Sequence, residues 1–282
     1  MLRRGKPDAE RVCAELIAWM GGRGLTAVLL PEHAALGLEG EVATEEEFPT
    51  KIDLLVSLGG DGTLLHGGGL VAQHAVPILG VNLGTLGFLT PFAITEAQSA
   101  LERAIDGALV LEQRIRLRVQ LHRAEGDVVE RFALNDAVLS QGGIARLIEL
   151  LATLDGTRVS HFRADGLIIS TPTGSTAYNL AAGGPILTPG LSAMCITPIC
   201  PHMLTNRPLV VPAHSRLEVT VTEAREVVLT VDGQWAHPVA PGDRVEISEA
   251  AAPLRLYRSE KSYFEILRDK LSWGARADAQ AP

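Results

Sequence analysis

The residues best suited to chemistry lie in one short stretch, residues 54–65 (LLVSLGGDGTLL). Its apolar run is long enough for a buried strand, breaks at the glycine turn 59–63 and resumes at Leu64, which predicts strand, turn and helix start. Backbone N–H groups at such a helix start can face an anion. Asp61 stands in this turn, where a carboxylate beside phosphates must bind a cation or take a proton. A tight connection with Asp61 as helix N-cap is the alternative.

Three other stretches carry more polar residues and glycine than packing requires. Asn135 and Asp136 interrupt an apolar strand, where Asn could read an adenine edge or hold a sugar hydroxyl. A strand bulge, or a strand end near water, is the favoured alternative. Residues 163–185 lead from a buried strand into TPTGSTAY, whose hydroxyls and N–H groups suit ribose and phosphate and whose Tyr178 could stack on a base. A capped helix without a ligand also fits there. Residues 232–234 (DGQ) favour a hairpin turn.

Composition excludes several classes of function. The net charge of −8 argues against nucleic acid or an anionic membrane as partner. The patterns GxxxxGK[ST], GxGxxG, GxSxG and HExxH do not occur, and the eight histidines show no ligand spacing. Three cysteines without CxxC spacing predict free thiols in a reducing cytosol. With no signal-peptide core and no apolar run near ~20 residues, we expect a cytoplasmic protein.

The rhythm of the elements predicts two domains. Residues 1–110 alternate strands with helices, which favours an α/β domain with a parallel, Rossmann-like sheet. Residues 111–254 carry short alternating strands separated by turns and predict a β-rich, mainly antiparallel domain; the run 128–139 reads there as one strand after a hairpin. A helix at 262–271 is expected to return to the first domain within residues 255–275, and 275–282 to form a tail.

Taken together, the motifs resemble the NAD kinase family. They occur in the family's order: GGDGT at 59–63, NLG and LGFL at 82–84 and 86–89, Asn135-Asp136, Asp165-Gly166, TPTGSTAY at 171–178, GGPIL at 183–187, PICPH at 198–202, RPLV at 207–210 and DGQ at 232–234. The first turn alone also resembles diacylglycerol and sphingosine kinases and phosphofructokinases, whereas its combination with TPTGSTAY is specific.

The resemblance implies an α/β domain followed by a β-rich domain, and a kinase that phosphorylates the 2′-hydroxyl of the adenosine ribose of NAD to give NADP. The donor would be ATP, another nucleotide or polyphosphate, used with Mg²⁺ or Mn²⁺. The family also implies a homodimer or homotetramer in which some NAD contacts cross the subunit interface. The resemblance does not identify metal ligands.

The resemblance also assigns roles to individual residues. Asp61 would be the general base, and Gly62 would lie beside the ribose. The other residues that it places at NAD are Asn135, Asp136, Asp165, Thr176, Ala177, Tyr178, Asn179, Leu180, Ala181 and Gln234, with Arg146, Arg163 and Asp232 as further candidates. His66 stands where many relatives carry Arg, and Ala181 where relatives often carry Ser.

Two alternatives stay open, and one departure concerns the fold. A lipid or sugar kinase would share the glycine turn but does not need TPTGSTAY. A non-catalytic NAD(P)-binding sensor would keep the pocket but could dispense with Asp61. The chain begins almost at the RGKP stretch that follows the family's first strand, so we expect that strand to be short or absent.

Overall fold

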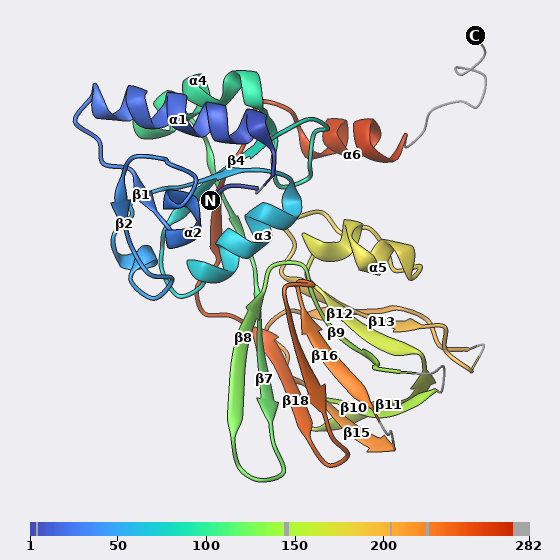
Figure 1. Cartoon of the computed structure of the whole chain (residues 1–282). Helices are drawn as coiled ribbons and strands as arrows, with labels where there is room; N and C mark the ends of the chain where they lie inside the picture. Colours follow the sequence, from blue (N-terminus) through green and yellow to red (C-terminus); the bar gives the residue numbers. More distant parts are fainter. Residues whose placement is uncertain (4, 144–146, 204, 224–225, 273–282) are drawn as a thin grey trace. The chain divides into compact units, whose positions relative to one another are not determined.

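The computed structural model describes residues 1–3, 5–143, 147–203, 205–223 and 226–272. The chain divides into two compact units (Figure 1). Unit 1 comprises Met1–Gln113 together with the segment from Leu254 onwards, and unit 2 comprises Arg114–Pro253. Each unit has its own hydrophobic core, so each is described by itself.

Unit 1 is an α/β unit built on a parallel sheet. The strand order is β3 (Leu55–Leu58), β4 (Pro77–Asn82), β19 (Leu254–Tyr257) and β6 (Leu111–Arg114), with β5 (Phe92–Ala93) pairing with β4. A separate parallel pair consists of β1 (Val28–Leu29) and β2 (Glu41–Val42). Strand β4 is buried along most of its length, as expected for a strand covered on both faces.

Five helices accompany the strands of unit 1 in the described residues. They are α1 (Pro7–Gly21), α2 (Pro31–Ala34), α3 (Asp61–Leu70), α4 (Ala97–Ile105) and α6 (Tyr263–Leu271), with short 3₁₀ turns at Phe48–Thr50 and Ile94–Glu96. Leu16 of α1 and Leu101 of α4 enter one core with Leu79 of β4. None of the helices in the described ranges is long and apolar enough to cross a membrane.

In the described residues, the segment before α1 pairs with β3 through a parallel bridge. Leu2 pairs with Leu58 in parallel, and the Arg3 amide donates to the Leu58 carbonyl at 2.9 Å. The amino group of Met1 donates to the carbonyl of Val56 at 2.9 Å, and burial lowers the pKa of this amine to about 6. The sequence analysis did not predict β19. This strand comes late in the chain and pairs in parallel with β4 of unit 1.

Unit 2 is a sandwich of two antiparallel sheets. One has the order β11 (Thr157–Ala164), β10 (Ile148–Leu154), β15 (Leu217–Glu223), β18 (Arg244–Glu249), β7 (Leu117–His122) and β8 (Val128–Ala133). The other has the order β14 (Leu209–Pro212), β13 (Ala193–Ile199), β12 (Gly166–Ser170), β9 (Asp136–Gln141), β16 (Val227–Val231) and β17 (Trp235–Val239). The 3₁₀ turn Gly174–Thr176 and helix α5 (Tyr178–Ala181) follow β12. Both sheets contribute to one core, which includes Leu150 and Leu167.

The sequence prediction of a single strand over 128–139 is wrong. The structure splits this run at Leu134 and Asn135 into β8 and β9, which belong to different sheets. Alternation of apolar residues does not reveal such a break, because both halves keep the strand period. The alternative of a strand end at Asn135 and Asp136 is confirmed.

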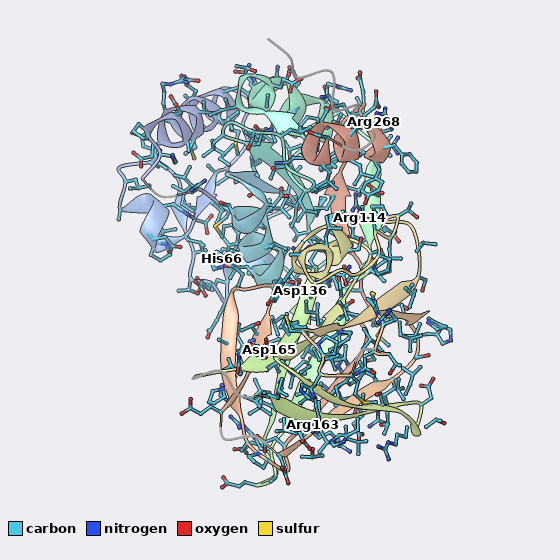
Figure 2. The ribbon with its side chains drawn as sticks, turned by 90° about the vertical axis from the view of Figure 1, so that its right-hand side faces the viewer. His66, Arg114, Asp136, Arg163, Asp165 and Arg268 are labelled. Atoms are coloured by element: carbon cyan, nitrogen blue, oxygen red, sulfur yellow. The ribbon has the colours of Figure 1, made fainter. Side chains whose placement is uncertain are left out.

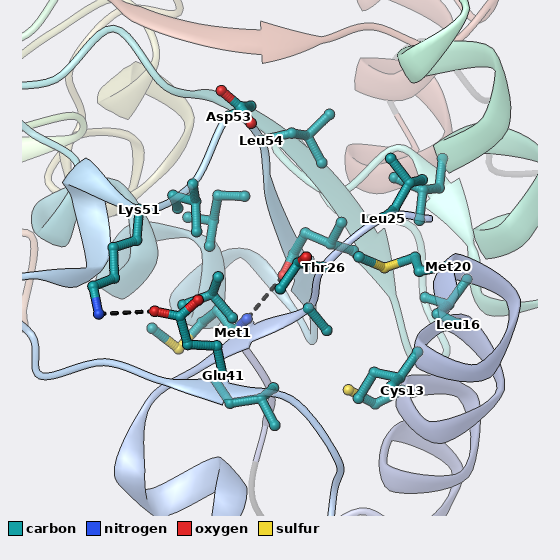
Figure 3. Close-up of a pocket in the computed structure, with 18 of the residues that line it drawn as sticks. Met1, Cys13, Leu16, Met20, Leu25, Thr26, Glu41, Lys51, Asp53 and Leu54 are labelled. Carbon is teal, nitrogen blue, oxygen red and sulfur yellow. Dashed lines mark hydrogen bonds and ion pairs between the residues drawn. The ribbon is translucent and has the colours of Figure 1, made fainter. Parts of the chain in front are cut away.

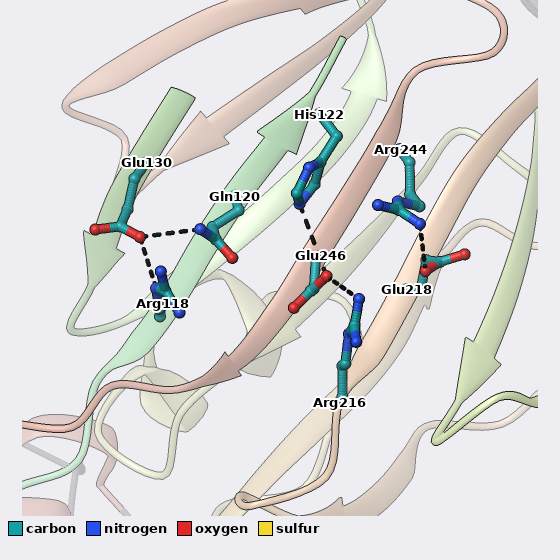
Figure 4. Close-up of polar contacts among 8 residues, drawn as sticks. All are labelled: Arg118, Gln120, His122, Glu130, Arg216, Glu218, Arg244 and Glu246. Carbon is teal, nitrogen blue, oxygen red and sulfur yellow. Dashed lines mark hydrogen bonds and ion pairs between the residues drawn. The ribbon is translucent and has the colours of Figure 1, made fainter. Parts of the chain in front are cut away.

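In the first of these two sheets, the outer face of the neighbouring strands β15, β18, β7 and β8 is charged. Leu117, Val119 and Leu121 of β7 face the core, and the alternate residues of neighbouring strands form cross-strand ion pairs (Figure 4). Arg118 pairs with Glu130 at 2.6 Å, Arg244 with Glu218 at 3.2 Å, and Arg216 with Glu246. Exposed pairs of this kind contribute about 0–1 kcal/mol each, so this face follows from the pleat and is not a candidate site.

Candidate functional site

In unit 1 the glycine turn places Asp61 at the start of a helix. Strand β3 ends at Leu58, Gly60 is the extended N-cap residue, and Asp61 is the first residue of α3. The alternative that Asp61 caps this helix is therefore wrong, and the structure records no side-chain cap there. The amides of Thr63 and Leu64 donate to the carbonyl of Gly60 at 3.0 and 3.2 Å.

The Asp61 carboxylate is instead held by a loop that follows β4. Oδ2 accepts the Phe88 amide at 2.9 Å, and Oδ1 accepts the Leu89 amide at 3.1 Å and the Thr90 hydroxyl at 3.0 Å. Asp61 remains partly exposed, and the adjacent Gly62 is exposed. A fixed, accessible carboxylate beside the free amides of a helix start is suited to proton transfer next to phosphates.

Two other features belong to this part of unit 1. His66 lies on α3 beyond the turn and is half-buried (Figure 2). Helix α6 brings Tyr263 against Phe88, with ring centroids 6.4 Å apart, and Tyr263 in turn contacts Phe264. The loop that holds Asp61 is thus packed against an aromatic pair from the end of the chain.

In unit 2 the break between β8 and β9 is organised by a second carboxylate. Asp232 accepts the amides of Leu134 at 2.8 Å, Asn135 at 2.7 Å and Asp136 at 3.0 Å. Asp232 has a positive φ of 51° and is followed by Gly233 at φ 62°. Residues 232–234 join Val231 of β16 to its partner Trp235 of β17, so the hairpin turn predicted for DGQ is present. The candidate residues Asn135, Asp136 and Asp232 therefore lie together.

The electrostatics of this cluster are dominated by burial. Burial, and then the charge of Asp232, raises the pKa of Asp136 to about 7. Burial also raises the pKa of Asp232, although three amide donors and Arg116 oppose the shift. Arg116 is itself buried, which lowers its pKa to about 10, and its guanidinium donates to the carbonyl of Ala252. Two carboxyls therefore share one weakly hydrated environment with one buried arginine.

The TPTGSTAY segment packs directly on this cluster. The amide of Thr171 donates to the carbonyl of Asn135 at 2.9 Å, and a Cβ on Gly174 would lie only 2.1 Å from the same oxygen. The segment can approach the Asn135 backbone this closely because residue 174 has no side chain. The polar turn and the Asn-Asp pair are thus in direct contact within unit 2.

Within this segment the buried side chain of Asn179 makes internal hydrogen bonds, whereas several neighbouring side chains are exposed to solvent. The Asn179 side chain is fully buried: it donates to the carbonyls of Ser175 and Pro185, both at 3.1 Å, and accepts the hydroxyl of Thr197 at 2.6 Å. Tyr178 is 47% exposed. The other candidates of the segment range from half-buried to exposed, namely Thr176, Ala177, Leu180 and Ala181. The side chains that face solvent are those available to a ligand.

Arg163 and Asp165 do not join this group within one chain. Asp165 precedes β12 and Thr171 follows it, and a strand of five residues spans ~17 Å. Figure 2 shows Asp136, Asp165 and Arg163 spread along unit 2 in this way. Arg163 pairs with Glu149 at 2.9 Å. Gln234 is exposed beside the Asp232 turn, and Arg146 lies outside the described residues.

A cavity of about 580 Å³ occurs elsewhere in unit 1 (Figure 3). Leu16 and Met20 of α1 line it together with Leu54, and the ion pair between Lys51 and Glu41 lies at its edge. None of the predicted site residues lines this cavity, so we do not assign substrate binding to it.

The described residues contain no cluster of side chains that could coordinate a metal ion by themselves. Among them, no three His, Cys, Asp or Glu side chains gather as metal ligands. The residues therefore do not fit a divalent cation held by protein ligands alone.

Sequence reasoning missed the contribution of two polar side chains. Thr90 and Asn82 are buried next to the Asp61 loop, where Asn82 bonds to three backbone groups. The available signal was a polar residue at each end of the glycine-punctuated run 82–90. Sequence reasoning also missed Arg116, which lies between β6 and β7 and is almost fully buried.

Segments from each of the two units match known protein families. Residues 27–109 match the model of the ATP-NAD kinase N-terminal domain, and residues 134–259 match that of the ATP-NAD kinase C-terminal domain. An NAD kinase from Geotalea daltonii is 46% identical over 272 residues, covering 96% of each chain. An NAD kinase from Solibacter usitatus is 45% identical, covering 95% of this chain and 94% of the relative.

Two solved structures are also similar. Yeast NADH kinase complexed with NADH superimposes with a TM-score of 0.91 at 28% identity, covering 97% of this chain and 86% of that one. An NAD kinase from Archaeoglobus fulgidus in complex with ATP gives a TM-score of 0.70 at 27% identity, covering 88% of this chain and 98% of that one. With both domain models matched and relatives above 40% identity along nearly its whole length, the chain belongs to the NAD kinase family.

Proposed function

We propose that this kinase transfers a phosphoryl group to the 2′-hydroxyl of the adenosine ribose of NAD, giving NADP. The observation that carries the proposal is the Asp61 carboxylate, fixed by three hydrogen bonds at the glycine-turn start of α3 in a member of the NAD kinase family. Relatives named NAD kinase, and solved kinases complexed with NADH or ATP, support the same substrates.

The chemistry needs one base and a place for phosphates. The ribose 2′-oxygen forms a bond to the terminal phosphorus of the donor while the bond from that phosphorus to the leaving nucleotide breaks. Asp61 takes the hydroxyl proton, since each carboxylate oxygen has two lone pairs and the loop fills only one on Oδ2. The helix start that carries Asp61 supplies amides for the donor phosphates.

Unit 2 supplies recognition of the dinucleotide in this proposal. Asn135 and Asp136 hold the adenosine side, and Tyr178 offers an exposed aromatic face. Arg163 and Asp165 lie at the other end of β12, so we assign them to the NAD site of a second copy in a homodimer or homotetramer. Gln234 would contribute from the Asp232 turn.

The donor is ATP, another nucleotide or polyphosphate. A divalent cation, Mg²⁺ or Mn²⁺, is proposed to arrive with the donor's phosphates, because the described residues form no metal cage. The free cysteines Cys13, Cys195 and Cys200 fit the cytoplasm as the proposed compartment.

One assay separates the proposal from its alternatives. Purified protein with ATP and Mg²⁺ is offered NAD, NADH and a diacylglycerol in parallel, and NADP, NADPH and phosphorylated lipid are quantified. Formation of NADP or NADPH supports the NAD kinase proposal. Phosphorylated lipid alone would indicate a lipid kinase, and tight NAD binding without product would indicate a sensor. A parallel reaction in excess chelator is expected to be inactive with ATP.

A further inference from the structure

The loop that holds Asp61 is itself fixed by a buried polar chain of contacts. Thr90 is fully buried, and its hydroxyl donates to Oδ1 of Asp61 at 3.0 Å. The carbonyl of Thr90 accepts the Asn82 side-chain amide at 3.2 Å and the Gly87 amide at 3.3 Å. These contacts fix the backbone of Thr90, and burial restricts its side chain. The hydroxyl is therefore held toward the Asp61 carboxylate.

Asn82 anchors this loop at both ends without contacting Asp61. Its Nδ2 also donates to the carbonyl of Phe92 at 2.9 Å, and its Oδ1 accepts the amide of Gly84 at 3.2 Å. Asn82 is the last residue of β4 and only 3% exposed, so the anchor belongs to the rigid sheet. Asn82 therefore acts on Asp61 through Thr90.

The space left by Gly87 completes the arrangement. A Cβ on Gly87 would lie 2.0 Å from Oδ1 of Asp61 and 2.3 Å from the hydroxyl oxygen of Thr90. No side-chain carbon fits at such distances, so the carboxylate and the hydroxyl occupy the volume that a larger residue would take. The glycine is needed here for space.

We propose that Thr90 is a positioning residue for phosphoryl transfer: its hydroxyl, pinned through Asn82 and given room by Gly87, aims the Asp61 carboxylate. The inference rests on the proposed function, because it gives the orientation of Asp61 a catalytic purpose. The loop fills two acceptor positions on Oδ1 and one on Oδ2, so the carboxylate is held from one side and keeps Oδ2 open to a ribose hydroxyl.

The test is Thr90→Val, which keeps the shape of the side chain and removes the hydroxyl. We expect kcat to fall about 10- to 100-fold, the scale of a hydrogen bond to a charged group, while KM for NAD stays within about twofold. Thr90→Ser keeps the hydroxyl and should restore most of the rate. Thr85→Val removes an exposed hydroxyl from the same loop and should leave kcat unchanged.

A double variant separates positioning from general loosening of the fold. If Thr90 acts through Asp61, adding Thr90→Val to Asp61→Asn should change the residual rate by less than about twofold. Gly87→Ala provides an independent displacement of the carboxylate and should lower kcat at least as much as Thr90→Val. Thermal melts of each variant report whether the fold is retained.

The outcomes that overturn this inference differ from those that overturn the function. An unchanged kcat in Thr90→Val, or an equal loss in the wild-type and Asp61→Asn backgrounds, contradicts the positioning role. A wild-type protein that makes neither NADP nor NADPH contradicts the proposed function instead. Full activity of Asp61→Asn contradicts the assignment of the base on which both depend.

Discussion

Two aspartates in different units are held in the same way, and we propose different roles for them. Asp61 in unit 1 and Asp232 in unit 2 each accept three hydrogen bonds, two on Oδ1 and one on Oδ2. The donors of Asp61 are two amides and one hydroxyl of a loop, whereas those of Asp232 are three consecutive amides where β8 gives way to β9. The number of donors is therefore the same for the carboxylate that we propose to react and for the one that we propose to be structural.

The surroundings distinguish them. Asp232 lies beside the buried groups Asp136 and Arg116. Burial raises the pKa of Asp136 and lowers the pKa of Arg116. Asp61 stands at an open helix start next to the exposed Gly62. We infer that Asp232 mainly fixes the strand break that presents Asn135 and Asp136, whereas Asp61 reacts. Four predictions follow from this contrast, beginning with the largest expected effect.

Replacing Asp61 by Asn should cost activity and little else. The change keeps the size of the side chain but removes the proton acceptor, so kcat should fall by about 10²–10⁴-fold. NAD affinity, measured by calorimetry, should stay within a few-fold. Asp53→Asn, an exposed aspartate of the same unit, serves as the matched control. A variant with near wild-type turnover would remove the contrast between the two aspartates.

Replacing Asp232 by Ala should cost stability. Three amides of the strand break would lose their acceptor, and we expect unfolding free energy to drop by about 2–4 kcal/mol in urea titrations. Asp127→Ala changes an exposed aspartate in the β7–β8 turn and should be nearly neutral. If Asp232→Ala melts like the wild type but no longer binds NAD, Asp232 is a ligand contact and not a structural one.

Replacing Asp136 by Asn should change how stability depends on pH. With a folded pKa of about 7 and an ordinary value near 4, the folded carboxyl keeps a proton that the unfolded chain has released. Stability of the wild type therefore falls as pH rises from about 4 to 7. The Asn variant should lack this component and be more stable than wild type at pH 8, by up to about 4 kcal/mol. Parallel melting-temperature curves from pH 4 to 8 would contradict this.

Replacing Tyr178 by Ala should weaken binding with the smallest free-energy change of the set. An aromatic face against a base contributes ~1–3 kcal/mol, so NAD affinity should fall by about one to two orders of magnitude. The half-exposed position predicts an unchanged melting temperature. Tyr178→Phe keeps the ring and should bind normally. Asn135→Ala should weaken NAD binding to a similar extent, which calorimetry beside thermal melts can verify. Normal affinity with a lower melting temperature would make the segment a structural turn.

Local patterns were sufficient for the fold class and the family. The glycine turn predicted β3 followed by α3, and alternation predicted β7 and its hairpin with the strand that follows, because short-range spacing records which face of an element is buried. The two-domain character and the membership of the NAD kinase family could be read from motifs in order along the chain.

Tertiary structure decided what the polar residues do. No spacing indicates that Thr90 reaches Asp61, that Asp232 binds the amides of residues 134–136, or that Asn179 is buried while Tyr178 beside it is exposed. Nor could a pattern show that 128–139 divides between two sheets or that β19 completes the first one. Each of these depends on groups far apart in the chain meeting in space, and hydrogen bonds and burial have no period along the sequence.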